Sequence, residues 1–172
     1  MSESGQAESY WDQVAPRYDS LYESAWALGE NRLAASRLCL HRSSDRTRVL
    51  DLGCGTGLGY RLLGGASSGM QYTGRDSSAA MLEILSSRHP EVTTSNGSMD
   101  DLRHLTEASF DFVMAIFAAA SYAQSPELLL SEISRVLAPH GLCYLSFLNR
   151  RSLRRVVRLK RGSREIFTTR GD

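Results

Sequence analysis

The stretch Arg48–Gly59, R-V-L-D-L-G-C-G-T-G-L-G, decides the fold. The mostly apolar run 49–52 is typical of a buried strand in a parallel sheet. Glycines then occupy every second position from Gly53 to Gly59, which indicates a sharp turn that another group approaches closely. From Leu58 the letters L-G-Y-R-L-L favour the first turns of a helix. A strand, a glycine-rich loop and a helix in this order open a nucleotide-binding βαβ unit.

The spacing of the glycines distinguishes between ligands. A dinucleotide site uses G-x-G-x-x-G to seat a pyrophosphate on a helix N-terminus. The third glycine of that pattern would fall at Leu58 or at Tyr60, which disfavours a nicotinamide oxidoreductase. The pattern here is acid-x-G-x-G-x-G, with Asp51 two residues before Gly53. A carboxylate there would repel a pyrophosphate but suits a ligand that carries an ammonium group; a merely structural tight turn is the alternative.

Composition and charge limit the class of protein. The chain has 172 residues, enough for one domain with its own core, and its net charge of +1 and 42% hydrophobic content are ordinary for a globular protein. No run approaches the ~18 apolar residues that span a bilayer. The polar, acidic N-terminus is unlike a signal peptide, so we expect a cytoplasmic protein. The three cysteines are far apart and predict neither disulfides nor a metal site.

The charge is distributed unevenly over a single expected domain, 1–172. Residues 1–149 contain 11 arginines and 17 acidic residues, whereas residues 150–172 contain 9 basic and 2 acidic residues. We expect a helical N-terminal cap over 1–44, an α/β core over 45–149 and a basic tail over 150–172. This asymmetry separates an acidic body from a basic end.

The cap is predicted to be helical in two pieces. A first amphipathic segment begins near Tyr10 and breaks near Pro16. A second helix from about Trp26 to Leu40 has Leu28, Leu33, Leu38 and several alanines available for one face.

Strand-like and helix-like segments alternate through the core. Four further strands are predicted: Met70–Gly74, Glu91–Ser95, Phe110–Phe117 and Leu142–Leu148. Pro139–Gly141 is predicted to form a turn before the last of these strands. Helices are predicted over Ala79–Arg88 and from Ser125, an N-cap followed by Pro126. Such alternation predicts a doubly wound, mainly parallel sheet. Its ligand lies at the carboxyl ends of the strands, so Gly53–Gly57 and Phe117–Tyr122 should face one another.

Asp76 closes the second predicted strand, 25 residues after Asp51. A carboxylate at this place can accept hydrogen bonds from both hydroxyls of a ribose. The alternative is that Asp76 caps the following helix, although Ser77 or Ser78 could supply that cap.

Taken together, these features resemble the class I S-adenosylmethionine (SAM) dependent methyltransferases over roughly residues 10–149. The resemblance implies an α/β Rossmann-like sheet in the order 3-2-1-4-5, SAM as cofactor, S-adenosylhomocysteine as product, and Asp51 at the methionine end of the cofactor. It also implies that W-x-x-x-A-x-x-Y-D, here Trp11 to Asp19, forms a lid. The residues implied to bind the cofactor are Tyr18, Asp51, Gly53, Cys54, Gly55, Gly57, Asp76, Ser77, Met81, Ser98, Met99 and Phe117.

The chain departs from the family pattern after the third predicted strand. Ser98 stands where the family usually has an acid for the adenine amino group, and the backbone N–H of Met99 would face the ring. Ser98 can accept a hydrogen bond but carries no charge. Asp100 and Asp101 are interpreted as a charge pair on a solvated turn at a helix N-terminus.

The segment after the fourth predicted strand narrows the substrate class. It reads F-A-A-A-S-Y from Phe117, without the Asn/Asp-Pro-Pro-aromatic motif of DNA aminomethylating enzymes, so no DNA partner is expected. No acid occurs between Asp111 and Glu127, unlike in protein arginine or catechol methyltransferases. The resemblance then implies a small-molecule methyl acceptor. No catalytic residue is assigned; Tyr122 is the nearest candidate, with packing as its favoured role.

The family usually adds two strands after the fifth, and residues 150–172 suit them badly. Arg150–Arg161 reads as a basic helix and Glu165–Thr169 as one strand, so the sheet is expected to be incomplete at its C-terminal edge. An open edge invites pairing, which makes a homodimer plausible. The tail could bind RNA or an acidic membrane surface, although a solvated helix is favoured. The alternative function is a truncated or catalytically inactive SAM-binding module that serves as a partner subunit.

Overall fold

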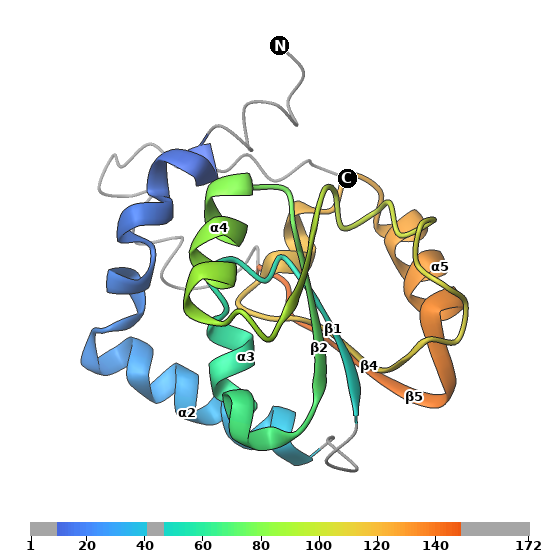
Figure 1. The fold of residues 1–172 in the computed structure, drawn as a ribbon, viewed down its shortest axis with the longest axis horizontal. Coiled ribbons are helices and arrows are strands. Elements are labelled where there is room, and N and C mark those ends of the chain that lie inside the picture. The colour runs from blue at the N-terminus through green and yellow to red at the C-terminus, as the bar shows by residue number, and fades with distance from the viewer. Residues whose placement is uncertain (1–9, 41–46, 149–172) are drawn as a thin grey trace.

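A computed structural model describes residues 10–40 and 47–148, whose centre is a five-stranded parallel sheet (Figure 1). The order is β3-β2-β1-β4-β5, as predicted from the family resemblance. The strands are β1 (Arg48–Leu52), β2 (Gln71–Asp76), β3 (Thr93–Asn96), β4 (Phe110–Ala115) and β5 (Leu137–Leu145). Strand order reverses between β1 and β4, which is where an open α/β sheet binds its ligand.

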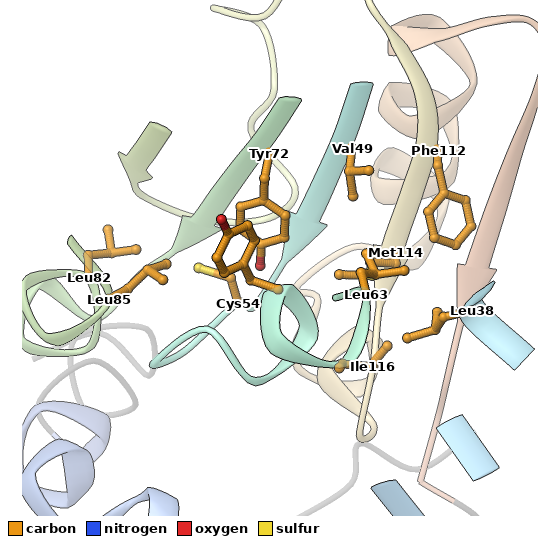
Figure 2. Close-up of a cluster of buried hydrophobic side chains, with 11 residues drawn as sticks. Leu38, Val49, Cys54, Leu63, Tyr72, Leu82, Leu85, Phe112, Met114 and Ile116 are labelled. Carbon is orange, nitrogen blue, oxygen red and sulfur yellow. The ribbon is translucent and has the colours of Figure 1, made fainter. Parts of the chain in front are cut away.

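Helices cover both faces of the sheet. The face with α2 (Ala25–Leu40), α3 (Leu58–Leu62) and α4 (Ala79–Arg88) buries one apolar cluster, and α5 (Pro126–Val136) covers the opposite cluster. Figure 2 shows the first cluster, in which Tyr72 and Phe112 of the strands lie on the same side as Leu63 and Leu85. Burial on both faces explains why β1 and β4 are almost continuously apolar.

Local capping signals in the sequence are confirmed at two helices. Ser78 precedes α4 and its Oγ accepts a hydrogen bond from the Met81 N–H at 3.2 Å. Ser125 precedes α5, accepts from the Leu128 N–H at 3.2 Å, and is followed by Pro126 at the first helical position. Both serines satisfy a backbone donor that a helix N-terminus leaves without a partner.

The last described strand begins earlier than predicted. β5 starts directly after α5, and residues 138–141 form an irregular bulge within it rather than a turn before it. The register shows this bulge, because Phe110 pairs with Leu137 whereas Phe112 pairs with Leu142. His140 has a positive φ of 64° inside the bulge. A β-bulge accommodates extra residues while keeping the flanking ladder intact, a possibility that a turn signal alone does not reveal.

The predicted apolar face of α2 was wrong. Leu38 is fully buried, but Leu28 and Leu33 are 47% and 54% exposed. Their spacing of five residues turns the helix by well over a right angle, so these three leucines do not share a face. The side chains that α2 buries include those of Ala27 and Asn31, which lie four residues apart, together with Leu38.

The chain before α2 forms an N-terminal strap, defined here as residues 10–22. It is helical over residues 10–14 and continues as 3₁₀ turns η1 (Ala15–Arg17) and η2 (Asp19–Tyr22), so the break near Pro16 is confirmed. Figure 1 shows it in blue, running beside α4 before it enters α2. Val14 and Ala15 are buried. The expected strand Glu165–Thr169 and basic helix Arg150–Arg161 lie outside the described residues.

Candidate cofactor site

The glycine loop follows β1 in the chain and is hydrogen-bonded to the carboxyl end of β2. The backbone N–H groups of Gly53 and Cys54 both donate to the Arg75 carbonyl oxygen, at 2.8 and 3.2 Å. A Cβ atom at Gly53 would lie 2.8 Å from Ala119 Cβ and 3.4 Å from Met99 Cε. The loop, the start of η4 (Ala119–Tyr122) and the segment after β3 therefore meet at one place. Gly53 thus packs directly on Ala119, which belongs to the segment Phe117–Tyr122 that was expected to face the loop across a ligand.

Gly55 lies beneath the aromatic ring of Tyr18. Its φ is +52°, and a Cβ atom there would be 3.3 Å from Tyr18 Cε1. The Tyr18 hydroxyl is 3.0 Å from that of Tyr22, and burial, with Tyr22 as the next cause, holds the pKa of Tyr18 well above its ordinary value. Tyr18 therefore stays neutral and presents an uncharged ring over the loop. The ring of Tyr18, the residue predicted to form a lid, thus lies against the glycine loop.

Asp76 connects the loop to the start of α4. Its Oδ2 accepts from the Gly55 N–H at 2.8 Å and its Oδ1 accepts from the Ser78 N–H at 2.9 Å. Burial raises the pKa of Asp76, while these backbone donors act in the opposite direction. Ser78, not Asp76, caps the helix. A carboxylate has about four acceptor positions, so Asp76 keeps capacity to accept from a ribose hydroxyl beside its backbone donors.

Asp51 lies under the loop rather than on its open side. It is fully buried, and the Tyr72 hydroxyl donates to its Oδ2 at 2.5 Å. Burial, with the charge of Asp76 as a further cause, raises the pKa of Asp51 to about 7. Its Oδ1 is buried and accepts no hydrogen bond from the described residues. An unmatched buried acceptor at this position fits a ligand that brings a donor, such as an ammonium group.

The segment after β3 is held by a buried arginine. Arg75 is 5% exposed and its Nε donates to the Ser98 carbonyl oxygen at 2.7 Å, while Nη1 donates to Ser95 Oγ at 2.6 Å. A Cβ atom at Gly97 would lie 2.5 Å from Arg75 Nη2, so the segment packs directly on the guanidinium. Arg75, a residue that the sequence did not single out, therefore fixes the backbone at Ser98, next to Met99.

The interpretation of Asp100 and Asp101 was wrong. No helix starts in this part of the described chain, and Asp100 is 6% exposed. Asp100 Oδ2 accepts from the N–H groups of Gln124 and Ser125, at 2.6 and 2.9 Å, and so fastens the start of α5 to this segment. Asp101 pairs with Arg103 at 2.8 Å. Two adjacent acids look alike in sequence, and only their partners in the folded chain show that Asp100 and Asp101 have different roles.

Phe117 extends the site toward α2. Phe117 and Ala118 both have positive φ, at 51° and 67°, and the Ala118 N–H donates to Ser146 Oγ at 2.8 Å. Non-glycine residues rarely adopt this conformation, which costs of order 1–3 kcal/mol each and is found mainly at functional sites. The Phe117 ring lies 5.2 Å from that of Tyr22, measured between centroids. The strained turn thus places an aromatic ring against the strap.

The remaining predicted residues lie around the loop in less direct positions. Cys54 is buried and its side chain points into the core cluster, so only its backbone can face a ligand (Figure 2). A Cβ atom at Gly57 would meet Leu85 Cδ1 at 2.5 Å, which makes that glycine a packing requirement of α4. Met81 is 2% exposed, whereas Ser77 is half-buried before α4.

Sequence reasoning missed several polar residues that assemble the site. They have no short-range signal, because their partners are far away in the chain: Asp12, Thr56, Arg61, Arg75 and Arg88. Among the described residues there is no group of three His, Cys, Asp or Glu side chains that could hold a metal ion. Nor does this described part contain a helix long and apolar enough to cross a bilayer.

Comparison with known proteins decides the family. A family model described as a methyltransferase domain matches residues 50–145, which is more than half of the chain. The chain belongs to the class I SAM-dependent methyltransferases. SAM is accordingly its cofactor.

Individual relatives cover this methyltransferase chain well but are longer than it. It is 31% identical over 156 residues to the biotin biosynthesis bifunctional protein BioHC of Cellvibrio japonicus, covering 90% of this chain and 29% of that protein. It is 27% identical to the ubiquinone biosynthesis O-methyltransferase of Maricaulis maris, covering 85% and 59% of the two chains. The chain therefore spans less than two thirds of either relative.

A solved structure supports the same fold. The complex between the Haloferax volcanii Trm112 methyltransferase activator and a putative methyltransferase matches with a TM-score of 0.63 and 25% identity. The match covers 80% of this methyltransferase chain and 59% of the chain compared.

Proposed function

We propose that this chain transfers a methyl group from SAM to a small molecule. One observation carries the proposal: Tyr18, Gly55 and Asp76 come together at the carboxyl ends of β1 and β2, in a chain of this family. In this proposal Tyr18 covers the cofactor, Gly55 lets the backbone approach it closely, and Asp76 accepts hydrogen bonds from its ribose. Asp51 Oδ1 adds a buried acceptor for the ammonium group of the cofactor.

Each residue has a proposed task toward the cofactor. Asp76 accepts from the ribose hydroxyls, and Ser98 and the Met99 N–H face the adenine. Gly53 and Gly55 allow the loop to turn beside Asp51, where we place the methionine portion. When bound, SAM supplies a methyl group on a sulfonium that is already activated. What the protein then contributes is placement of the acceptor and exclusion of water.

An open hollow beside the strap supports the proposed class of acceptor. A cavity of about 450 Å³ lies between α2 and the ends of β4 and β5, within the usual size range of small-molecule sites. Glu30 and Arg37 line part of this cavity. Most of its wall is formed by apolar and aromatic side chains: Tyr22, Leu33, Ile116, Phe117, Tyr144 and Leu148. Phe117 and Tyr22 connect this cavity to the strap. An apolar small molecule fits such a wall, and the Maricaulis maris relative, named for ubiquinone biosynthesis, is consistent with that class.

Tyr122 is not proposed as a base. Burial, with Tyr10 and Tyr22 as further causes, raises the pKa of Tyr122 to about 12, and its ring packs 5.8 Å from that of Trp11. The hydroxyl therefore keeps its proton at neutral pH. For compartment and assembly we keep the cytoplasm and a homodimer as proposals; the outer edge of β5 has no partner strand among the described residues.

The test uses the full chain of 172 residues. We expect S-adenosylhomocysteine to raise its thermal unfolding midpoint and NAD to leave it unchanged. Labelled SAM should then transfer its methyl group to members of a panel of apolar acceptors with hydroxyl, amine or carboxyl groups. Stabilisation by NAD alone would overturn the proposal. Binding of S-adenosylhomocysteine without transfer to any acceptor would instead indicate the inactive module.

A further inference from the structure

The N-terminal strap is fastened at one end to the start of α4. Ser78 Oγ donates to Asp12 Oδ1 at 2.6 Å, and the Ala80 N–H reaches the same oxygen at 3.3 Å. Asp12 therefore places a negative charge at the N-terminus of α4, where backbone N–H groups and the helix dipole favour it. Ser78 is itself the N-cap residue and is completely buried.

The other end of the strap is fastened to the glycine loop and to the end of α4. The Thr56 hydroxyl donates to Asp19 Oδ1 at 2.5 Å, and Arg61 Nη2 lies 3.4 Å from that oxygen. Arg88, the last residue of α4, forms an ion pair with Asp19 Oδ2. Although partial burial acts to raise it, the pKa of Asp19 is lowered by the bonds from Thr56 and Arg88.

Tyr18 lies between these two attachments and next to the second. Its ring is 3.3 Å from the Cβ position of Gly55, and Thr56, the next loop residue, is completely buried. The strap therefore contacts the two ends of α4 through Asp12 and Asp19. The ring of Tyr18 belongs to the segment between these two contacts. Figure 1 shows this course, with the blue strap alongside the green α4.

We infer that Asp19 and Asp12 are positioning residues that hold Tyr18 over the cofactor and so set how long the cofactor stays bound. The inference rests on the proposed function. A cofactor seated beside Gly55 and covered by the strap leaves only when the strap lifts, and lifting Tyr18 also strains the adjoining bonds of Asp19. The side chains of Asp19 and Arg88 are 28% and 49% exposed, so salt screens their attraction. Cofactor release is therefore faster at high ionic strength.

Release rates of S-adenosylhomocysteine, measured by stopped-flow displacement, test this inference. We expect Asp19→Asn to raise the dissociation rate about tenfold or more, because it weakens charge-assisted bonds, with a smaller effect on association. Raising the salt concentration should speed release from the wild type more than from the variant. Arg88→Gln, which leaves the strap sequence intact, should speed release in the same direction.

The matched control is Asp111→Asn. Asp111 also accepts a hydrogen bond from an arginine, Arg48, at 2.6 Å, and both side chains are partly exposed. This pair lies at the N-terminal ends of β1 and β4, away from the glycine loop. The Asp111→Asn variant should release S-adenosylhomocysteine at the rate of the wild type. Hydrogen exchange of residues 12–22 supplies a second readout, since Asp19→Asn should speed exchange there without lowering the unfolding midpoint more than Asp111→Asn does.

The possible results distinguish the positioning role of Asp19 from the proposed function. Unchanged release from both Asp19→Asn and Arg88→Gln, with the wild type binding S-adenosylhomocysteine, overturns the positioning role and leaves the proposed function intact. Failure of the wild type to bind S-adenosylhomocysteine overturns both. Equal acceleration by Asp111→Asn shows a general loss of stability and also overturns the positioning role.

Discussion

The Gly55 N–H donates to Asp76 Oδ2 across 2.8 Å, so the glycine loop after β1 and the acid that ends β2 form one unit. The same carboxylate holds the Ser78 N–H at the start of α4. A ligand bound at this place contacts a loop whose shape is fixed before binding. Pre-organisation of this kind reduces the ordering cost of association.

Replacing Gly55 by valine should abolish cofactor binding. The side chain would enter the space beneath Tyr18, and the φ of +52° is unfavourable for a β-branched residue. Calorimetry with S-adenosylhomocysteine checks this result. Gly29→Ala is the control, because a Cβ atom at Gly29 in α2 meets nothing within 4 Å. Full affinity in Gly55→Val would show that no ligand lies against this loop.

Asp76→Ala should weaken S-adenosylhomocysteine binding by about 1.5–3 kcal/mol, the range for hydrogen bonds to a charged group. It also removes the acceptor of the Gly55 and Ser78 N–H groups, so we expect a lower free energy of unfolding as well. Calorimetry and urea unfolding measure the two effects separately. Loss of stability with unchanged affinity would leave Asp76 a purely structural role.

Ser98→Asp should tighten binding of S-adenosylhomocysteine, because a carboxylate accepts a stronger hydrogen bond from the adenine amino group than a hydroxyl does. Arg75 holds the Ser98 carbonyl oxygen at 2.7 Å, so the backbone that carries the new acid is already positioned. Ser98→Asn separates charge from shape. If Ser98→Asp binds no more tightly than the wild type, the assignment of residues 96–102 to the adenine is wrong.

Stability should fall with rising pH because of Asp51. Its pKa of about 7 in the folded protein lies above the ordinary value near 3.9, so the folded state binds more protons than the unfolded state between these values. The stability present at low pH is therefore lost as the pH rises through about 4 to 7. Urea unfolding at pH 5 and pH 8 should show a smaller loss for Asp51→Asn than for the wild type. An equal loss in both proteins would contradict a buried, titrating Asp51.

Much of the fold could be predicted because its signals are local. The caps at Ser78 and Ser125 depend on neighbours three residues away, and the glycine loop is a contiguous pattern. The irregular start of β5 could not, because a bulge depends on the register with β4. The apolar face predicted for α2 was wrong because Leu28 and Leu33 are five residues apart, a spacing that does not match one helical face.

The candidate site could be predicted only in part, for the same reason. Gly53, Gly55 and Asp76 stand at fixed places relative to the strands, so sequence spacing brings them together. The contact between Asp19 and Thr56 joins residues 37 positions apart, and Asp100 reaches 24 and 25 positions along the chain. Such partners follow from the tertiary arrangement of α4 and α5, which residue spacing does not encode.

The long reach of the strap also has a consequence for biogenesis. Asp12 and Asp19 bind partners 66 and 69 positions downstream, at Ser78 and Arg88. A nascent chain leaves the ribosome with its N-terminus first, so the strap emerges early and its partners Ser78 and Arg88 become available only after α4 has been translated. Contacts of such sequence separation form late in folding, since the loop between them must close first. The enclosure around Gly55 is therefore not completed before the chain has been made as far as the end of α4.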